Sequence, residues 1–192
     1  MRTFYIFLFS ILLFSCTNQT NINPQIEIKT ELGTIIVELF PEKAPVTCEN
    51  FLKYVDGKLL SEASFYRTVT MANQPNNNIK IEVIQGGLGF DVEESAYPPI
   101  QLETTKTTGL KHLDGTISMA RAEPGTASSE FFICIGNQPE LDYGGMRNND
   151  GQGFAAFGQV IKGMDIVQKI QKLPNHEQFF INPISITISR TE

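Results

Sequence analysis

The sequence predicts a mainly β protein, an antiparallel barrel that is closed or nearly closed and has helices over its ends. Three observations lead to this fold class: eight runs have the composition of strands, two segments have convincing helical spacing, and strands do not alternate regularly with helices. With 192 residues and 41% hydrophobic content, the chain has enough apolar side chains for one domain with a sizeable core.

The expected strands follow from apolar residues that alternate with polar ones between turn-forming Gly, Pro and Asn residues. The first helix is expected over 44–57, with Pro45 near its start and Gly57 at its end, and the second over 163–173. The eight strand runs cover residues 26–30, 33–40, 64–69, 79–85, 115–120, 130–136, 154–160 and 184–189.

The beginning of the chain is distinct from this domain. After Arg2, the apolar run from Phe4 to Phe14 is typical of a secretory signal, because eleven residues are too few for a helix to cross a bilayer. Ser15-Cys16 follow the run directly, and this arrangement resembles a bacterial lipoprotein signal. The resemblance implies that cleavage leaves Cys16 as a lipidated N-terminus. The alternative is an ordinary signal peptide with an incidental cysteine.

We therefore expect a signal peptide at 1–15, a lipid-anchored polar tether at 16–25 and a barrel domain at 26–192. The stretch after Cys16 is uncharged and rich in Asn, which suits a short tether. These features predict a protein of the bacterial cell envelope, periplasmic or surface-exposed, that contacts the membrane through its lipid anchor only. We expect it to be a monomer.

Charge and cysteine content narrow the choice of partners. The whole chain carries a net charge of −6, and loss of residues 1–15 removes one cation and no acid, which leaves 14 cations against 21 acids, or −7. Such acidity disfavours nucleic acid as a partner. Cys48 and Cys134 fall in an expected helix and an expected core strand, so we expect buried free thiols rather than a disulfide.

The residues also disfavour two kinds of catalytic chemistry. His112 and His176 have no partner at a metal-ligand spacing, so we expect no metal site. The segment TASSEF lacks the flanking glycines of a nucleophile elbow, which argues against a serine hydrolase.

Arg67 is the unusual residue of the strand expected at 64–69. Period-two alternation places Phe65, Arg67 and Val69 on one face, so a guanidinium stands in an apolar row. An unpaired buried charge is very costly. Arg67 therefore has to lie at an edge, pair with a carboxylate, or line a ligand pocket.

Four blocks in order carry a family likeness: SFYR, IQGG, GTISMARAEPGTASSEFFICIG, and LD followed by GFAAFGQV. Together they resemble the cyclophilin-type peptidyl-prolyl cis-trans isomerases, and the likeness runs from about Glu27 to Ile188. The resemblance implies a closed eight-stranded antiparallel β-barrel capped by two α-helices. It also implies an enzyme that rotates X-Pro peptide bonds without any cofactor, with proline-containing polypeptide segments as its partners.

The resemblance assigns roles to individual residues of this chain. It implies that Arg67, Gln85 and Phe132 are catalytic: Arg67 stabilises the twisted amide, Gln85 holds the arginine and the substrate backbone, and Phe132 lines the proline pocket. The substrate-binding residues that it implies are Val83, Arg121, Ala122, Leu141 and Phe154. Within the third block, we expect Phe132 to face the groove while Phe131 packs in the core, because neighbouring side chains of a strand point to opposite faces.

Two departures from the family pattern bear on activity. The first is a polar, turn-rich insertion at 70–78. The second is the pair Glu82-Val83, which stands where the family usually has two apolar residues. A carboxylate of Glu82 that faced Arg67 would neutralise the guanidinium. Glu140 replaces an aromatic residue at the rim. Glu82 and Glu140 favour the alternative function, a non-catalytic cyclophilin-like chaperone or scaffold that binds Pro-containing segments.

Overall fold

The computed structural model describes residues 23–89 and 96–191, so the expected signal peptide, Cys16 and most of the tether lie outside the described residues. The helices are α1 (Pro45–Asp56), α2 (Thr105–Thr108) and α3 (Met164–Gln171), with a 3₁₀ turn η1 (Pro139–Leu141). The strands are β1 (Gln25–Thr30), β2 (Gly33–Leu39), β3 (Ser64–Val69), β4 (Val83–Gly87), β5 (Thr116–Met119), β6 (Phe131–Cys134), β7 (Ala155–Lys162), β8 (Asn175–His176), β9 (Phe179–Ser185) and β10 (Thr187–Arg190).

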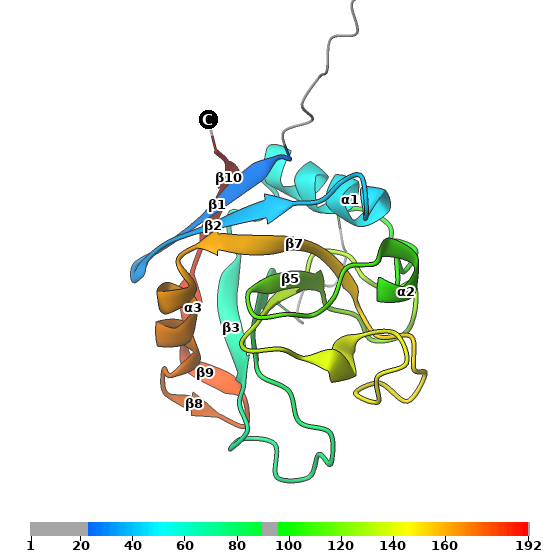
Figure 1. Ribbon diagram of the computed structural model, residues 1–192. Coiled ribbons are helices and arrows are strands. Elements are labelled where there is room, and N and C mark those ends of the chain that lie inside the picture. Colours follow the sequence, from blue (N-terminus) through cyan, green and yellow to red (C-terminus); the bar gives the residue numbers. More distant parts are fainter. Residues whose placement is uncertain (1–22, 90–95, 192) are drawn as a thin grey trace, which may run out of the picture.

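The strands form one antiparallel sheet in the order β10-β1-β2-β7-β5-β6-β4-β3-β9-β8 (Figure 1). The described part of the chain thus has ten strands in an open order, and the prediction of a closed eight-stranded barrel is not confirmed. Two details explain why the structure has ten strands where eight were predicted. The short β8 has no apolar pattern, and the expected last strand is divided at Ile186, whose N–H donates to Ala63 O instead of to the ladder. Because β9 pairs with β3 and β10 with β1, this bent segment brings the two sides of the sheet together.

The two predicted helices are present, and a third, four-residue helix was not predicted. Helix α1 packs against β7 and β10, and α3 packs against β2 and β4 (Figure 1). The Glu103 carboxylate accepts hydrogen bonds from the backbone N–H groups of Val46 and Thr47, which have no partner inside the first turn of α1. The unpredicted α2 consists of TKTT, a composition rich in β-branched residues that sequence patterns do not associate with helices.

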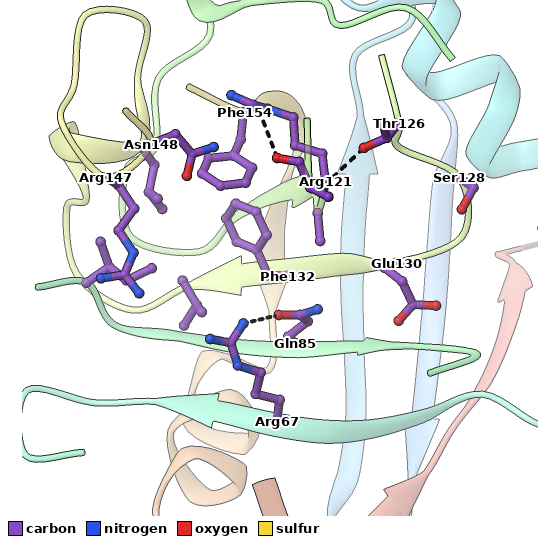
Figure 2. Close-up of a pocket in the computed structure, with 15 residues that line it drawn as sticks. Arg67, Gln85, Arg121, Thr126, Ser128, Glu130, Phe132, Arg147, Asn148 and Phe154 are labelled. Atoms are coloured by element: carbon purple, nitrogen blue, oxygen red, sulfur yellow. Dashed lines mark hydrogen bonds between the residues drawn. The ribbon is translucent and has the colours of Figure 1, made fainter. Parts of the chain in front are cut away.

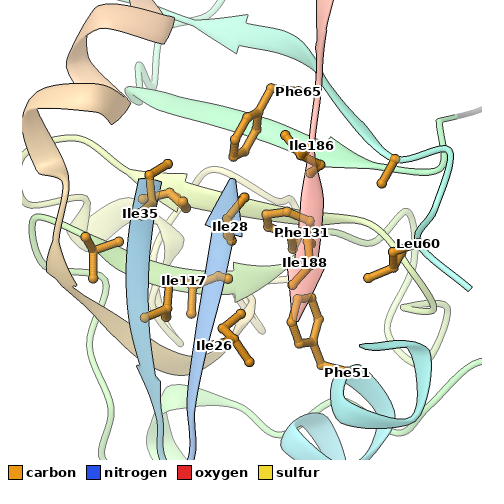
Figure 3. Packing of buried hydrophobic residues seen from close by; sticks show 14 of the residues in the cluster. Ile26, Ile28, Ile35, Phe51, Leu60, Phe65, Ile117, Phe131, Ile186 and Ile188 are labelled. Atoms are coloured by element: carbon orange, nitrogen blue, oxygen red, sulfur yellow. The ribbon is translucent and has the colours of Figure 1, made fainter. Parts of the chain in front are cut away.

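The main core fills the space between the sheet and the helices (Figure 3). Phe51 of α1 contacts Phe131 of β6 edge-on and Phe157 of β7 at a tilt, with ring centroids 5.5 and 5.1 Å apart. Cys48 and Cys134 are both buried free thiols, as predicted. Burial raises the pKa of Cys48 to about 12, so this thiol is unreactive at neutral pH.

A β-bulge in β3 sets the direction of the site residues. The register of β3 with β4 shifts between Phe65 and Arg67, so Tyr66 is an extra residue. Phe65 therefore packs in the main core, whereas Arg67 and Val69 point to the opposite face of β3. The prediction that Phe65, Arg67 and Val69 share one face is wrong for Phe65, because alternation is interrupted wherever a bulge inserts a residue.

A second hydrophobic cluster lies on the face to which Val69 points. Its members come from β3, β4, β6, η1 and the segment before β4, and it is separated from the main core by the backbone of the sheet. The buried residues of this cluster are Val69, Ile81, Val83, Phe132, Cys134 and Leu141, with Ala120 and Phe154 packed against them. This cluster forms the floor of the candidate site.

Candidate active site

A pocket of about 500 Å³ opens over the second cluster (Figure 2). All eight residues that the sequence singled out as catalytic or substrate-binding line this one pocket, although they come from 67 to 154 in the chain. The lining also includes residues that the sequence did not indicate. The full set is Arg67, Ile81, Val83, Gln85, Ala120, Arg121, Ala122, Thr126, Ser128, Glu130, Phe132, Leu141, Arg147, Asn148 and Phe154.

Arg67 reaches into the pocket from β3 and is held by two neutral amides. Its Nη1 donates to Gln85 Oε1 at 2.8 Å (Figure 2). Its Nε and Nη2 donate to Gln178 Oε1 at 3.2 and 2.6 Å. Burial, together with the nearby charge of Arg147, lowers the pKa of Arg67, but a guanidinium remains protonated in proteins. Across 23–89 and 96–191, no carboxylate forms an ion pair with Arg67.

Gln178 is a site residue that sequence reasoning missed. It lies in the two-residue turn between β8 and β9, where Glu177 and Gln178 have φ angles of 48° and 77°. Residues other than Gly, Asn and Asp rarely adopt this left-handed backbone conformation. Only a recognisable turn signal in the sequence could have pointed to Gln178. The segment NHEQFF has no such signal, because it lacks the Asn-Gly pair that normally marks a two-residue hairpin turn.

A hydrogen-bonded chain leads from Arg67 to the other wall of the pocket. Gln85 Nε2 donates to Tyr66 Oη at 2.7 Å, and Tyr66 Oη donates to Glu130 Oε2 at 2.5 Å. The second carboxylate oxygen of Glu130 accepts the backbone N–H groups of Leu88 and Gly89. The bulge at Tyr66 makes this chain possible, because it turns the phenol toward Glu130 beside the pocket. Gln85 is thus fixed with its carbonyl oxygen toward Arg67.

The apolar hollow of the pocket is built around Phe132. Phe154 stands edge-on to Phe132 with ring centroids 5.3 Å apart, and Leu141 is fully buried beside them. The structure separates the two neighbouring phenylalanines as predicted: Phe131 packs in the main core and Phe132 lines the pocket. Such a hollow suits an apolar ring of a bound ligand.

His112 supports Phe132 from below. Its ring stacks on Phe132 at 6.0 Å and 17°, and its Nδ1 and Nε2 lie 2.8 Å from Asp142 Oδ1 and 2.9 Å from Ser118 Oγ. Asp142 is ionised, so Nδ1 donates to it and, in the neutral ring, Nε2 accepts from Ser118. The order Ser-His-Asp matches a hydrolase triad, but Ser118 is fully buried and cannot reach a substrate. The array is structural.

One backbone edge of the pocket is open to pairing. Arg121 and Ala122 follow β5, and neither the N–H nor the C=O of Arg121 has a partner within the described residues. The Ala122 N–H donates to Thr126 Oγ1 at 3.1 Å. The Arg121 side chain is held by Asp150, with Nη1 and Nη2 at 2.8 and 2.9 Å from its two oxygens. The site can therefore add one short stretch of an extended peptide at Arg121.

Glu82 does not neutralise Arg67. Its side chain points away from the pocket and accepts a hydrogen bond from Gln171 at 3.2 Å, because Glu82 and Val83 are adjacent and face opposite sides. The insertion at 70–78 folds back against the segment before β4 through the buried Gln74, whose Nε2 donates to Thr70 O and Ile81 O. Within 23–89 and 96–191, no group of three or more His, Cys, Asp or Glu is placed to hold a metal ion.

The fold and the pocket define an antiparallel β protein with a peptide-sized groove beside an unpaired backbone edge. Residues 25–191 match the family described as cyclophilin type peptidyl-prolyl cis-trans isomerase/CLD. The chain belongs to this family and is an isomerase enzyme.

Known relatives agree over most of the chain. It is 37% identical over 156 residues to a peptidyl-prolyl cis-trans isomerase of Acinetobacter baylyi, covering 79% of this chain and 74% of the relative. It is 34% identical to peptidyl-prolyl cis-trans isomerase B of Escherichia coli, covering 74% and 80%. A crystal structure of a Cryptosporidium parvum cyclophilin-type isomerase superposes with a TM-score of 0.71 at 26% identity, covering 88% of this chain and 98% of that one. A second structure of that protein was determined in the presence of the dipeptide Ala-Pro.

Proposed function

We propose that this isomerase rotates X-Pro bonds by hydrogen-bonding the twisted amide with Arg67 while Phe132, Leu141 and Phe154 enclose the proline ring. The observation that carries the proposal is the position of Arg67: its guanidinium borders the apolar hollow and is bound to neutral acceptors alone. Its five N–H donors are not all used by Gln85 and Gln178, so donors remain for a substrate.

The chemistry needs a donor and an apolar hollow and no covalent step. Rotation of a peptide bond has a barrier of about 18–20 kcal/mol because amide resonance is lost. At the twisted geometry the prolyl nitrogen regains its lone pair and accepts a hydrogen bond, which it cannot do in the planar amide. A donor fixed at that position stabilises the transition state more than the ground state, which is the requirement for catalysis. A pocket low in water also favours the less dipolar twisted form.

The positioning of Arg67 matters as much as its charge. Gln85 and Gln178 accept from it on two sides, and Gln85 is itself fixed through Tyr66 and Glu130. A donor that is already oriented does not have to be reoriented during the reaction. Arg121 supplies the backbone groups that align the peptide, while Val83 and Ala122 border the same pocket.

The alternative of a non-catalytic chaperone or scaffold depended on Glu82 and Glu140. Glu82 is engaged by Gln171 outside the pocket. Glu140 accepts the backbone N–H of Met146 at 2.8 Å and is not among the residues that line the pocket. Neither carboxylate competes for Arg67, so no observation favours the alternative over catalysis.

The test is the variant Arg67→Ala. We expect it to slow catalysed isomerisation of an X-Pro peptide at least about tenfold, which corresponds to about 1.4 kcal/mol of transition-state stabilisation. Line-shape or exchange NMR without a coupled protease measures the rate. Arg190→Ala, which removes a surface arginine paired with Asp56, is the matched control and should keep the wild-type rate. Wild-type turnover in Arg67→Ala would remove Arg67 from the mechanism.

We also propose that the enzyme acts on proteins of the bacterial cell envelope and is held there by a lipid on Cys16. The support is the sequence of the first 16 residues, which combines an apolar run with Ser15-Cys16. None of the helices in 23–89 and 96–191 is long and apolar enough to cross a membrane.

A further inference from the structure

Three arginines line the pocket, and they differ in how their charge is balanced. Arg121 is neutralised by Asp150 through two parallel hydrogen bonds, and its Nε donates to Gly153 O at 2.9 Å. Arg67 and Arg147 have neutral acceptors only. Burial lowers the pKa of Arg147, which indicates that this cation is partly removed from water without a countercharge.

Arg147 is carried over the pocket by the long loop between η1 and β7. One nitrogen fixes it: Nη1 donates to Gln74 Oε1 at 3.0 Å and to Ile79 O at 2.7 Å. No described group accepts a hydrogen bond from its Nε or Nη2. The guanidinium is thus immobilised by Gln74 of the insertion and by Ile79 just after it, while two of its nitrogens keep donors for a ligand.

The acidic groups near the pocket are directed elsewhere. Glu140 bonds Met146 N, and Glu82 bonds Gln171. Glu130 lines the pocket, but Tyr66, Leu88 and Gly89 all donate to its carboxylate. Figure 2 shows Arg147 and Glu130 on opposite sides of Phe132. The side of the pocket that holds Arg67 and Arg147 is therefore positive in a protein whose net charge is negative.

We propose that Arg147 forms an anion subsite that selects substrates with an Asp or Glu side chain close to the proline. Arg147 donates the hydrogen bonds, and the charge of Arg67 adds to the local positive potential. The pair of free nitrogens on one planar group matches the two oxygens of a carboxylate. This inference rests on the proposed function and names the substrate class of the same site.

The geometry also assigns the acidic residue to one side of the proline. Figure 2 shows Arg147 and Arg121 on different sides of Phe132. We therefore expect a peptide that pairs at Arg121 and places its proline ring against Phe132 to reach Arg147 on the side away from Arg121. The carboxylate is therefore expected within one or two residues of the proline on that side and not on the other.

The experiment compares peptides that differ by one isosteric residue. A series of acetylated and amidated peptides contains one proline and otherwise Ala, with either Glu or Gln at one of the two positions before the proline or one of the two positions after it. For wild type, we expect kcat/KM to be about tenfold higher for Glu than for Gln at one position, mainly through a lower KM. Amidated C-termini keep the terminal carboxylate from acting as the anion.

Three variants separate charge from loop structure. Arg147→Gln should bring the Glu-to-Gln ratio close to one, and Arg147→Lys, which keeps the charge but loses the planar fork, should leave an intermediate ratio. Arg190→Gln removes the same charge far from the pocket and should leave the ratio as in wild type. A structural role of Arg147 in the loop would change both peptides of a pair equally and would not move the ratio.

Two results would overturn the inference: equal kcat/KM for Glu and Gln at every position in wild type, or a ratio that survives Arg147→Gln. The proposed function is tested separately by the Gln peptides, which the wild type must isomerise faster than the uncatalysed rate. Should that acceleration be missing, equilibrium binding of each Glu and Gln pair to wild type and Arg147→Gln still decides whether the anion subsite exists.

Discussion

Arg67 shows how a half-buried guanidinium can be held in one orientation without losing its charge. Two amide oxygens, from Gln85 and Gln178, accept its hydrogen bonds and leave it fully charged, whereas a carboxylate would cancel the charge. Burial without a countercharge lowers the pKa of Arg67, but the group remains protonated. The arrangement combines a fixed orientation with a strong donor.

Gln178 is a positioning residue because its side-chain oxygen accepts two hydrogen bonds from Arg67, and the variant Gln178→Gly tests this role. The variant removes the double acceptor of Arg67, so kcat should fall about tenfold with little change in KM, because a mobile donor loses its alignment. The free energy of unfolding should fall by about 2 kcal/mol. The variant loses three side-chain hydrogen bonds of about 1 kcal/mol each, two from Arg67 and one to Asn73 O, and glycine relieves about 1 kcal/mol of left-handed strain.

Glu177→Gly is the matched control for Gln178→Gly. Glu177 has the same left-handed conformation but is exposed, and its side chain does not contact Arg67. Wild-type kcat in Glu177→Gly together with a loss in Gln178→Gly assigns the effect to the side chain of Gln178. An equal loss in both variants would mean that the shape of the turn controls the rate.

Strand β3 and the segment from His112 to Ser118 show how elements align the pocket. The bulge at Tyr66 sends Arg67 toward the pocket while Phe65 stays in the core. On the other side, the buried His112 connects Asp142 to Ser118 and lies under Phe132. The bulge acts through neighbouring residues of β3, whereas the His112 array acts through contacts between residues that lie far apart in the sequence.

The pair of Asp142 and His112 should make stability depend on pH. Burial raises the pKa of Asp142, but hydrogen bonds from the His112 ring and backbone, together with nearby positive charge, outweigh it and lower the pKa overall. A folded-state pKa below the unfolded value of about 4 means that the carboxylate stabilises the fold above that pH. This contribution is lost as pH falls through the folded-state pKa.

Asp142→Asn is the variant that measures this contribution. We expect the free energy of unfolding at pH 7 to fall by about 1–3 kcal/mol, since a buried hydrogen bond to a charge is weakened, and its decline below pH 5 to become shallower. Urea unfolding at several pH values gives both quantities. Asp165→Asn, in an exposed pair with Lys169, serves as the control and should follow wild type. Parallel pH profiles for wild type and Asp142→Asn would contradict the assignment.

The molecule as a whole is built on a single sheet, and its pocket opens over the second hydrophobic cluster. The described chain starts next to β1 (Figure 1). Strand β1 begins at Gln25, so the last residue of the predicted tether already pairs in the sheet with Glu38. A lipid on Cys16 would thus be joined to the domain by a tether of about eight residues, at most roughly 30 Å long when extended.

Lipidation of Cys16 can be tested by labelling the protein with a radioactive fatty acid in a bacterial host. Wild type should incorporate the label and Cys16→Ala should not, because the proposed linkage needs the cysteine at the new N-terminus. Cys48→Ala removes a buried thiol and should keep the label. A mature wild-type N-terminus at any residue other than Cys16 would refute the anchor.

The sequence by itself determined the antiparallel β class, α1, α3 and the location of most strands, because alternation and helical spacing are local properties. The family likeness placed Arg67, Gln85 and Phe132, which the structure then brings to one pocket. The opposite placement of Phe131 and Phe132 also followed from alternation.

The tertiary structure alone decided how the sheet is arranged and what surrounds Arg67. The open order of ten strands, the bulge at Tyr66, and the approach of Gln178 and Arg147 to the pocket depend on residues that lie far apart in the sequence. No local pattern marks these contacts, since each is fixed by packing and hydrogen bonds between separate elements. The charge balance of the pocket is therefore a property of the fold.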